Sequence, residues 1–183
     1  MAARIPAQKK TSIFLTPAEY LERVVDGALV ADGNHYVIMI PKNWPTRSYK
    51  LVGDAFGSIT VVGDGDGTAI REGAGDGYAA RNGAGMGNAV RDGTGVGHAF
   101  RGGAGRGDAV RIGAGFGDAV RNGPGRGDAR RLDGGRDNGT ARRVGTGHGH
   151  AYFNGVLVDA CKKDVGVVMI GGYGPAASRL SGS

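Results

Sequence analysis

Eight arginines recur at a fixed spacing through the middle of this chain. Seven stand ten residues apart, and the eighth follows after a shift of two residues: Arg71, Arg81, Arg91, Arg101, Arg111, Arg121, Arg131 and Arg143. A guanidinium group is a planar fork of donors that holds a phosphate or carboxylate through two contacts. Like charges stacked this closely repel one another, so the column needs carbonyl groups, carboxylates or an external anion as partners.

Two interpretations of the arginine column follow. The arginines either bind an anionic partner, or they belong to the scaffold and bond to neighbouring units and to carbonyl groups of the turns. Residues that recur in every unit usually define the unit itself, which favours the structural interpretation. Further basic residues enrich the C-terminal half of the repeat: Arg106, Arg126, Arg130, Arg136 and Arg142.

The positions that change from unit to unit form a second candidate surface. Solenoid proteins commonly bind through such an extended, non-repeating face, and Tyr78, His98 and Phe116 are its candidate contacts here. One variable position is nearly always apolar and is therefore expected to be buried: Ile70, Ala80, Val90, Phe100, Val110 and Val120. This expectation conflicts with an inward-facing column of glycine, alanine and arginine, and the sequence leaves open which face is interior.

All these positions belong to a decapeptide repeat between Gly63 and Asn154. Units such as GAGDGYAARN and GAGMGNAVRD keep three glycines, one alanine and one arginine. Because the period is even, each position always faces the same side of an extended chain. A β-solenoid fits this pattern, and so does an antiparallel meander with turns at sites such as Asn82-Gly83. Glycine leaves a meander little to bury, and a fixed period indicates stacked units.

We therefore predict a mainly β fold, a β-solenoid of about nine ten-residue coils over residues 63–154. Large apolar side chains are concentrated outside the repeat, which is typical of caps. Residues 1–62 are expected to form a small α/β cap. Its helix starts with a capping box at Thr16 and Glu19; a hairpin over 28–40 and strands at 49–52 and 58–62 follow.

The C-terminal segment, residues 155–183, is expected to form a β cap and a flexible tail. Tyr152 to Val158 has the pattern of a hairpin, and 165–170 has that of a strand. A single cysteine, Cys161, excludes an intramolecular disulfide framework and suits a reducing, cytoplasmic setting. No segment is apolar enough for a secretory signal or a membrane helix.

The sequence predicts no enzyme. It has no nucleophile motif, no phosphate-binding loop between a strand and a helix, and no paired carboxylates. His98, His148 and His150 lack ligand partners at a fixed spacing, so neither a metal nor a cofactor is expected. The 183-residue chain carries a formal net charge of +6, which favours anionic partners.

The GxGxGxAxR array over residues 63–154, about half of the chain, resembles that of uncharacterised glycine-rich decapeptide-repeat proteins of phages and prophages. The resemblance implies a phage or mobile-element origin and carries over no functional residues. It suggests either a virion component or an accessory factor that blocks a host system, such as an anti-CRISPR protein.

Three hypotheses about function follow. The first is a non-enzymatic binding protein that docks on a host protein or nucleoprotein complex in the host cytosol and blocks it. The second is direct binding of nucleic acid through the arginine column, with an affinity that falls steeply with salt. The third is a structural spike or fibre segment of a virion. Fibre segments are usually obligate trimers, so the oligomeric state, which the sequence leaves open, separates the third from the others.

Overall fold

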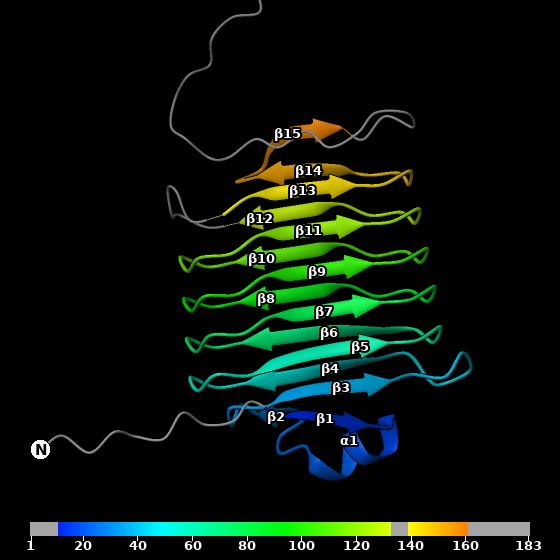
Figure 1. Cartoon of the computed structure of the whole chain (residues 1–183), viewed down its shortest axis with the longest axis vertical. Helices are drawn as coiled ribbons and strands as arrows, with labels where there is room; N and C mark the ends of the chain where they lie inside the picture. Colours follow the sequence, from blue (N-terminus) through cyan, green and yellow to red (C-terminus); the bar gives the residue numbers. More distant parts are fainter. Residues whose placement is uncertain (1–10, 133–138, 161–183) are drawn as a thin grey trace, which may run out of the picture.

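The structure, a computed structural model, describes residues 11–132 and 139–160 and shows them folded as a parallel β-solenoid. After a first strand and one short helix, the chain winds along the rod through short strands separated by turns (Figure 1). The predicted mainly β solenoid is confirmed. The meander is not adopted, because consecutive strands of the repeat lie in different sheets and each pairs in parallel with the strand twenty or so residues away.

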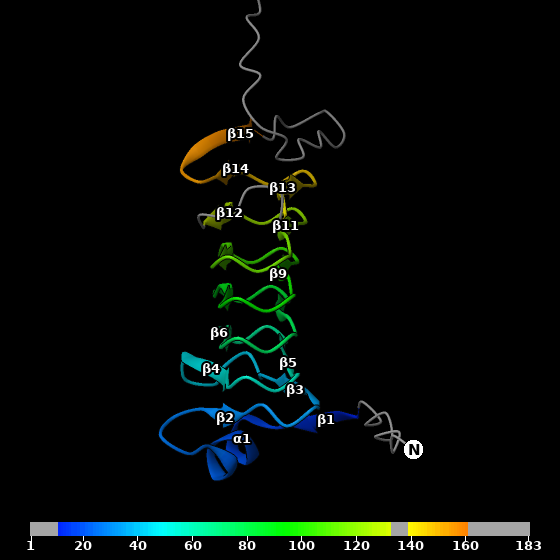
Figure 2. The ribbon, with the colours of Figure 1, turned by 90° about the vertical axis from the view of Figure 1, so that its left-hand side faces the viewer.

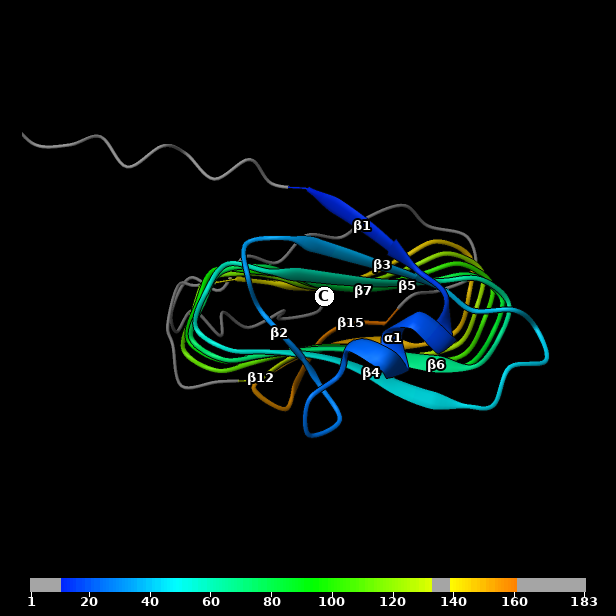
Figure 3. The ribbon, with the colours of Figure 1, turned by 90° about the horizontal axis from the view of Figure 1, so that it is seen from below.

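Two sheets face each other across a thin interior (Figure 2), and the rod is a flattened oval when seen from one end (Figure 3). The seven-stranded sheet contains, in order, β1 (Ser12–Leu15), β3 (His35–Met39), β5 (Ser58–Val62), β7 (Ala79–Asn82), β9 (Ala99–Gly102), β11 (Ala119–Asn122) and β13 (Ala141–Val144). The eight-stranded sheet contains β2 (Leu29–Val30), β4 (Arg47–Val52), β6 (Gly67–Glu72), β8 (Ala89–Asp92), β10 (Ala109–Ile112), β12 (Ala129–Leu132), β14 (His150–Phe153) and β15 (Val156–Ala160).

A full turn of the rod takes two repeat units. Arg91 pairs with Arg111 in one sheet and Arg81 with Arg101 in the other, so neighbours in space are twenty residues apart. Ten-residue coils were expected. Each unit instead supplies one strand of four to six residues and one turn, which together make half of a turn of the two-sheet rod. The sequence period cannot reveal this, because successive units share the same pattern.

Side chains alternate strictly between the interior and the outside. In β8, Ala89 and Arg91 are 0% exposed, whereas Val90 and Asp92 lie on the outer face and are partly exposed. The apolar column that was expected to be buried therefore lies on the outer faces of both sheets, where Ala80 is buried at 5% exposure and the other five are partly exposed: Ile70, Val90, Phe100, Val110 and Val120. The physical reason is space: arginine side chains fill the ends of the thin interior, and only alanine fits between the sheets.

In the described part of the chain, a core of large apolar side chains lies at the N-terminal end, whereas the cluster toward the C-terminal end is built on Ala129, Ala141 and Ala151. Leu15, Ile38 and Val61 occupy the column that holds arginine further along the chain, and Leu51 pairs with Arg71 in the other sheet. Helix α1 (Pro17–Arg23) lies at this end of the rod (Figure 1). The expected N-terminal cap is therefore the place where large side chains replace the arginine and glycine pattern.

The predicted capping box of α1 is present. Thr16 Oγ1 accepts a hydrogen bond from the Glu19 backbone N–H at 3.2 Å, and the Glu19 carboxylate accepts one from the Thr16 N–H at 2.7 Å. The helix is seven residues long and ends at Arg23. The hairpin predicted over 28–40 was wrong: β2 pairs with β4, and β3 with β1 and β5, because the turn between β2 and β3 crosses from one sheet to the other.

At the C-terminal end, β14 and β15 form the predicted hairpin, which joins the eight-stranded sheet. Phe153 occupies the arginine position above Arg131. The expectations for residues 1–10, for the shift at residues 133–134, and for Cys161, the strand at 165–170 and the tail lie outside the described residues.

Candidate functional site

Each buried arginine is held by the glycine turn one level below it. Arg91 donates from Nε to the carbonyl oxygen of Gly77 at 2.9 Å, from Nη2 to Gly75 at 2.6 Å and from Nη1 to Gly73 at 3.1 Å. Nη1 also donates to the carbonyl oxygen of Asp92. The three glycines of one repeat unit thus form a cradle of carbonyl groups around a single guanidinium group.

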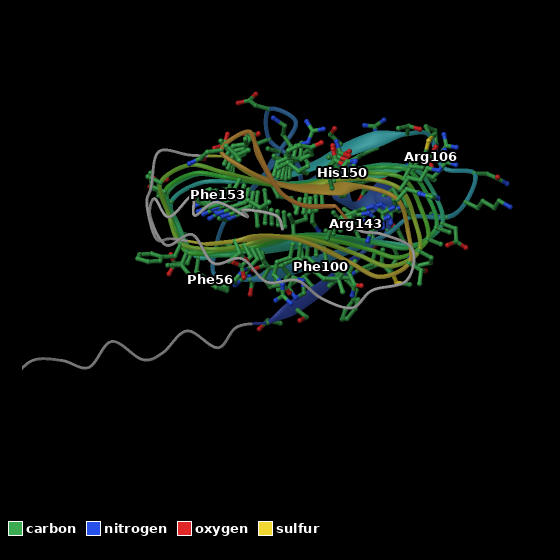
Figure 4. All side chains as sticks on the ribbon, turned by 90° about the horizontal axis from the view of Figure 1, so that it is seen from above. Phe56, Phe100, Arg106, Arg143, His150 and Phe153 are labelled. Atoms are coloured by element: carbon green, nitrogen blue, oxygen red, sulfur yellow. The ribbon has the colours of Figure 1, made fainter. Side chains whose placement is uncertain are left out.

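The same cradle recurs along the rod. Nη2 of Arg101 lies 2.6 Å from the carbonyl oxygen of Gly85, and Nη2 of Arg111 lies 2.8 Å from that of Gly95. Arg71 uses Ala55 in this role, at 2.7 Å, so the cradle begins one unit before the repeat is recognisable in the sequence. Figure 4 looks down the rod and shows the guanidinium nitrogens stacked inside the ribbon near Arg143.

The arginine interior carries an electrostatic cost. Burial is the main cause that lowers the pKa of Arg101 to about 9, and the charges of Arg81 and Arg121 in adjacent turns add to it. Burial likewise lowers the pKa of Arg91 to about 10. A buried cation is tolerated only when hydrogen bonds replace its hydration. The carbonyl cradle supplies those bonds and in turn satisfies backbone groups that would otherwise be buried without partners.

The spacing of the glycines follows from the same packing. A Cβ atom at Gly75 would collide with the carbonyl oxygen of Ala55 in the turn below, so no side chain fits there. Gly77 adopts φ +134°, a backbone conformation that favours glycine. Glycine at alternate positions lets the backbones stack closely enough for their carbonyl groups to face the guanidinium.

The seven arginines proposed as partner contacts are each 0% exposed: Arg71, Arg81, Arg91, Arg101, Arg111, Arg121 and Arg131. Their guanidinium groups point into the interior and bond to the backbone. In this fold they cannot contact a macromolecule on the outside, and their recurrence is explained by the cradle. The arginine column therefore offers no accessible surface to a nucleic acid.

The other candidate contacts lie together on one side of the rod. Tyr78 and His98 precede equivalent strands in successive turns of the seven-stranded sheet, and Phe116 precedes the next strand of that sheet. His98 is exposed, and its Nδ1 accepts a hydrogen bond from the Asp118 backbone N–H at 3.0 Å. Phe116 is 58% exposed. The structure thus brings these three residues onto one surface.

A polar cluster of His35, Thr60 and Tyr78 lies on the same sheet. His35 Nε2 is 2.9 Å from Thr60 Oγ1 and 3.1 Å from the Tyr78 hydroxyl. Burial lowers the pKa of His35, and Thr60 is only 8% exposed. These contacts hold three neighbouring strands together on their outer face. No sequence pattern indicates this cluster, because its members are 18 to 43 residues apart.

The two edges of the flattened rod differ in chemistry. At the same position, the described turns that lead into strands β5, β7, β9 and β11 of the seven-stranded sheet carry Phe56, Asp76, Val96 and Phe116. The three apolar side chains, Phe56, Val96 and Phe116, are here called the apolar edge. The turns that lead into strands β6, β8, β10, β12 and β14 of the eight-stranded sheet carry Asp66, Met86, Arg106, Arg126 and His148. The last three, toward the C-terminal end, are here called the basic edge. Figure 4 shows Phe56 and Arg106 at opposite ends of the oval.

Sequence reasoning missed these two edges. All six side chains occupy the same position of the decapeptide, so they looked like one irregular column. Units alternate between the two sides of the rod, and the twenty-residue register sorts them into two separate columns. A comparison of every second unit in the sequence is the signal that separates them.

Among the residues that the structure describes, no group of three or more His, Cys, Asp or Glu side chains is placed to hold a metal ion. The described part of the chain also contains no helix of the length and apolarity needed to cross a membrane. No protein-family model, curated protein or solved structure matches this chain.

Proposed function

We propose that this chain is a non-enzymatic binding protein that docks its apolar edge on a protein or nucleoprotein complex. One observation carries the proposal: Val96 and Phe116 are 49% and 58% exposed in successive turns of a scaffold whose recurring residues are interior. Apolar side chains grouped on a surface commonly mark an interaction site. The cradle of carbonyl groups holds the turns that present them, so little ordering is needed on binding.

The resemblance to phage and prophage repeat proteins supports a more specific form of this proposal. The partner is then a host complex, and binding blocks it, as in an anti-CRISPR or other anti-defence protein. This role requires no catalytic group, because occupation of the target's surface is sufficient.

Affinity capture from a host lysate, read by mass spectrometry, tests the proposal. The double variant Val96→Ser/Phe116→Ser removes apolar surface from the edge. Its control is Val25→Ser/Val30→Ser, which removes two valines that are 67% and 59% exposed in the N-terminal cap. A stoichiometric partner that is retained by the wild type and the control but lost by the edge variant supports the proposal. Equal capture by both variants, or no stoichiometric partner, rejects it.

A further inference from the structure

The basic edge is a regular ladder. The carbonyl oxygens of Arg106, Arg126 and His148 each accept a hydrogen bond from a glycine N–H in the turn below: Gly87, Gly107 and Gly127, all at 2.9 Å. The β-type ladder thus continues around the turns, and the side chains stack at about the strand spacing of 4.8 Å. Arg106, Arg126 and His148 are all exposed.

The carboxylates nearest to this ladder already have partners. Asp108 and Asp128 stand two residues after Arg106 and Arg126 and also face outward. Asp128 Oδ2 accepts a hydrogen bond from Arg130 Nη2 at 2.8 Å, and Asp108 Oδ2 lies 3.8 Å from Arg130 Nε. The Oδ1 atoms of both accept backbone N–H groups of the turn above.

Arg130 therefore offsets one of the two carboxylate charges, and the side chains of Arg106 and Arg126 are exposed to solvent in neighbouring turns. Two cations about one strand spacing apart repel each other, and an anion that contacts both relieves the repulsion. A phosphate fits this role, because each guanidinium donates two parallel hydrogen bonds to its oxygens.

From this geometry we infer that the basic edge binds the phosphate backbone of a single-stranded nucleic acid. The ladder continues over three turns, which suits a polymer of phosphates. The adjacent outer face adds Tyr152, whose ring lies 5.7 Å from the Arg130 guanidinium carbon and 6.0 Å from the His150 ring. Proteins that bind single strands combine a basic track with aromatic side chains on which bases stack. These outer arginines are distinct from the buried column.

Fluorescence anisotropy with the full chain and a labelled single-stranded DNA or RNA of about 20 nucleotides tests the inference at about 50 mM salt. The variant Arg106→Gln/Arg126→Gln removes two positive charges from the ladder. The matched control Arg23→Gln/Arg47→Gln removes two charges from exposed arginines near the N-terminal end. We expect the ladder variant to bind about tenfold more weakly and the control to stay within about twofold of the wild type.

A second readout separates specific phosphate contacts from general attraction. Loss of two contacts reduces the slope of log affinity against log salt by about 1.5, and the control variant keeps the wild-type slope. The inference is overturned if both variants weaken binding equally, or if the wild type binds neither strand. It is also overturned if polyglutamate displaces the nucleic acid as readily as an unlabelled strand does, since the edge then recognises acidic chains in general. It does not rest on the apolar edge, so either proposal can fail alone.

Discussion

Arg91 Nη2 lies 2.6 Å from the carbonyl oxygen of Gly75, which belongs to the turn one level below. Arg71, on that lower level, donates to the same oxygen at 3.3 Å. One glycine carbonyl therefore links two levels of the rod through two guanidinium groups. The bond from Nη2 to a glycine carbonyl in the turn below recurs along the chain and takes the place of packing between large apolar side chains.

Because the cradle accepts several hydrogen bonds from each guanidinium group, the stability of the rod depends on the separate N–H donors of arginine and not only on its positive charge. Arg101→Lys keeps a cation but loses the separate donors that reach Gly83, Gly85 and Gly87. Each buried carbonyl group left without a donor costs about 1–3 kcal/mol, so we expect a loss of about 3 kcal/mol in the free energy of unfolding by urea. Arg106→Lys, on the exposed edge, should change it by less than about 0.5 kcal/mol. Equal stability of the two variants would contradict the cradle.

Close stacking of the turns predicts that one methyl group is enough to destabilise them. Gly75→Ala places a Cβ against the carbonyl oxygen of Ala55, and the turns must separate to admit it. We expect a loss of about 2–3 kcal/mol in thermal or urea unfolding. Ala74→Ser, an exposed change in the same turn, is the control and should be nearly neutral. A Gly75→Ala protein that unfolds like the wild type would show that the turns are not in contact.

In the strands of the repeat, the larger apolar side chains lie outside and alanine lies inside. Substitutions of the outer apolar residues should therefore be tolerated better than substitutions of alanine. Val90 is apolar but lies on the outer face, so Val90→Ser should cost less than about 1 kcal/mol. Its neighbour Ala89 is 0% exposed between the sheets, and Ala89→Leu should destabilise by about 3 kcal/mol or prevent folding, because the interior has no space for a larger side chain. Chemical denaturation of the two variants is the measurement. If Val90→Ser destabilised the protein more than Ala89→Leu, Val90 would lie in the interior and Ala89 on the outer face.

The burial of His35 predicts that part of the protein's folding stability is lost at acidic pH. Burial lowers its pKa in the folded chain below the ordinary value of 6.5, so the unfolded chain binds the proton more readily. The contribution of neutral His35 to folding stability is therefore fully present above about pH 6.5. It is lost as the pH falls through the pKa of His35 in the folded chain. We expect the melting temperature to decrease between about pH 7 and pH 5, and to decrease less in His35→Gln, which keeps a polar partner for Thr60. Parallel pH profiles for the two proteins would exclude this role.

Much of the fold followed from the repeat alone. The even period predicted that glycine, alanine and arginine share one face, and the structure has them on one face. The capping box at Thr16 and the hairpin of residues 150–160 were also predicted, because each depends on residues close together in the sequence. The hairpin over 28–40 failed because local turn chemistry does not tell whether a turn joins partners in one sheet or crosses between two.

The sequence by itself determined that the units stack and that the positions of the repeat divide between two faces. Only the tertiary structure decided which face is interior, since carbonyl groups of distant turns surround each guanidinium and make its burial possible. It also decided that two units complete a turn. That register places Arg106 beside Arg126 and Val96 beside Phe116, on opposite edges of the rod, although all four occupy the same position of the decapeptide.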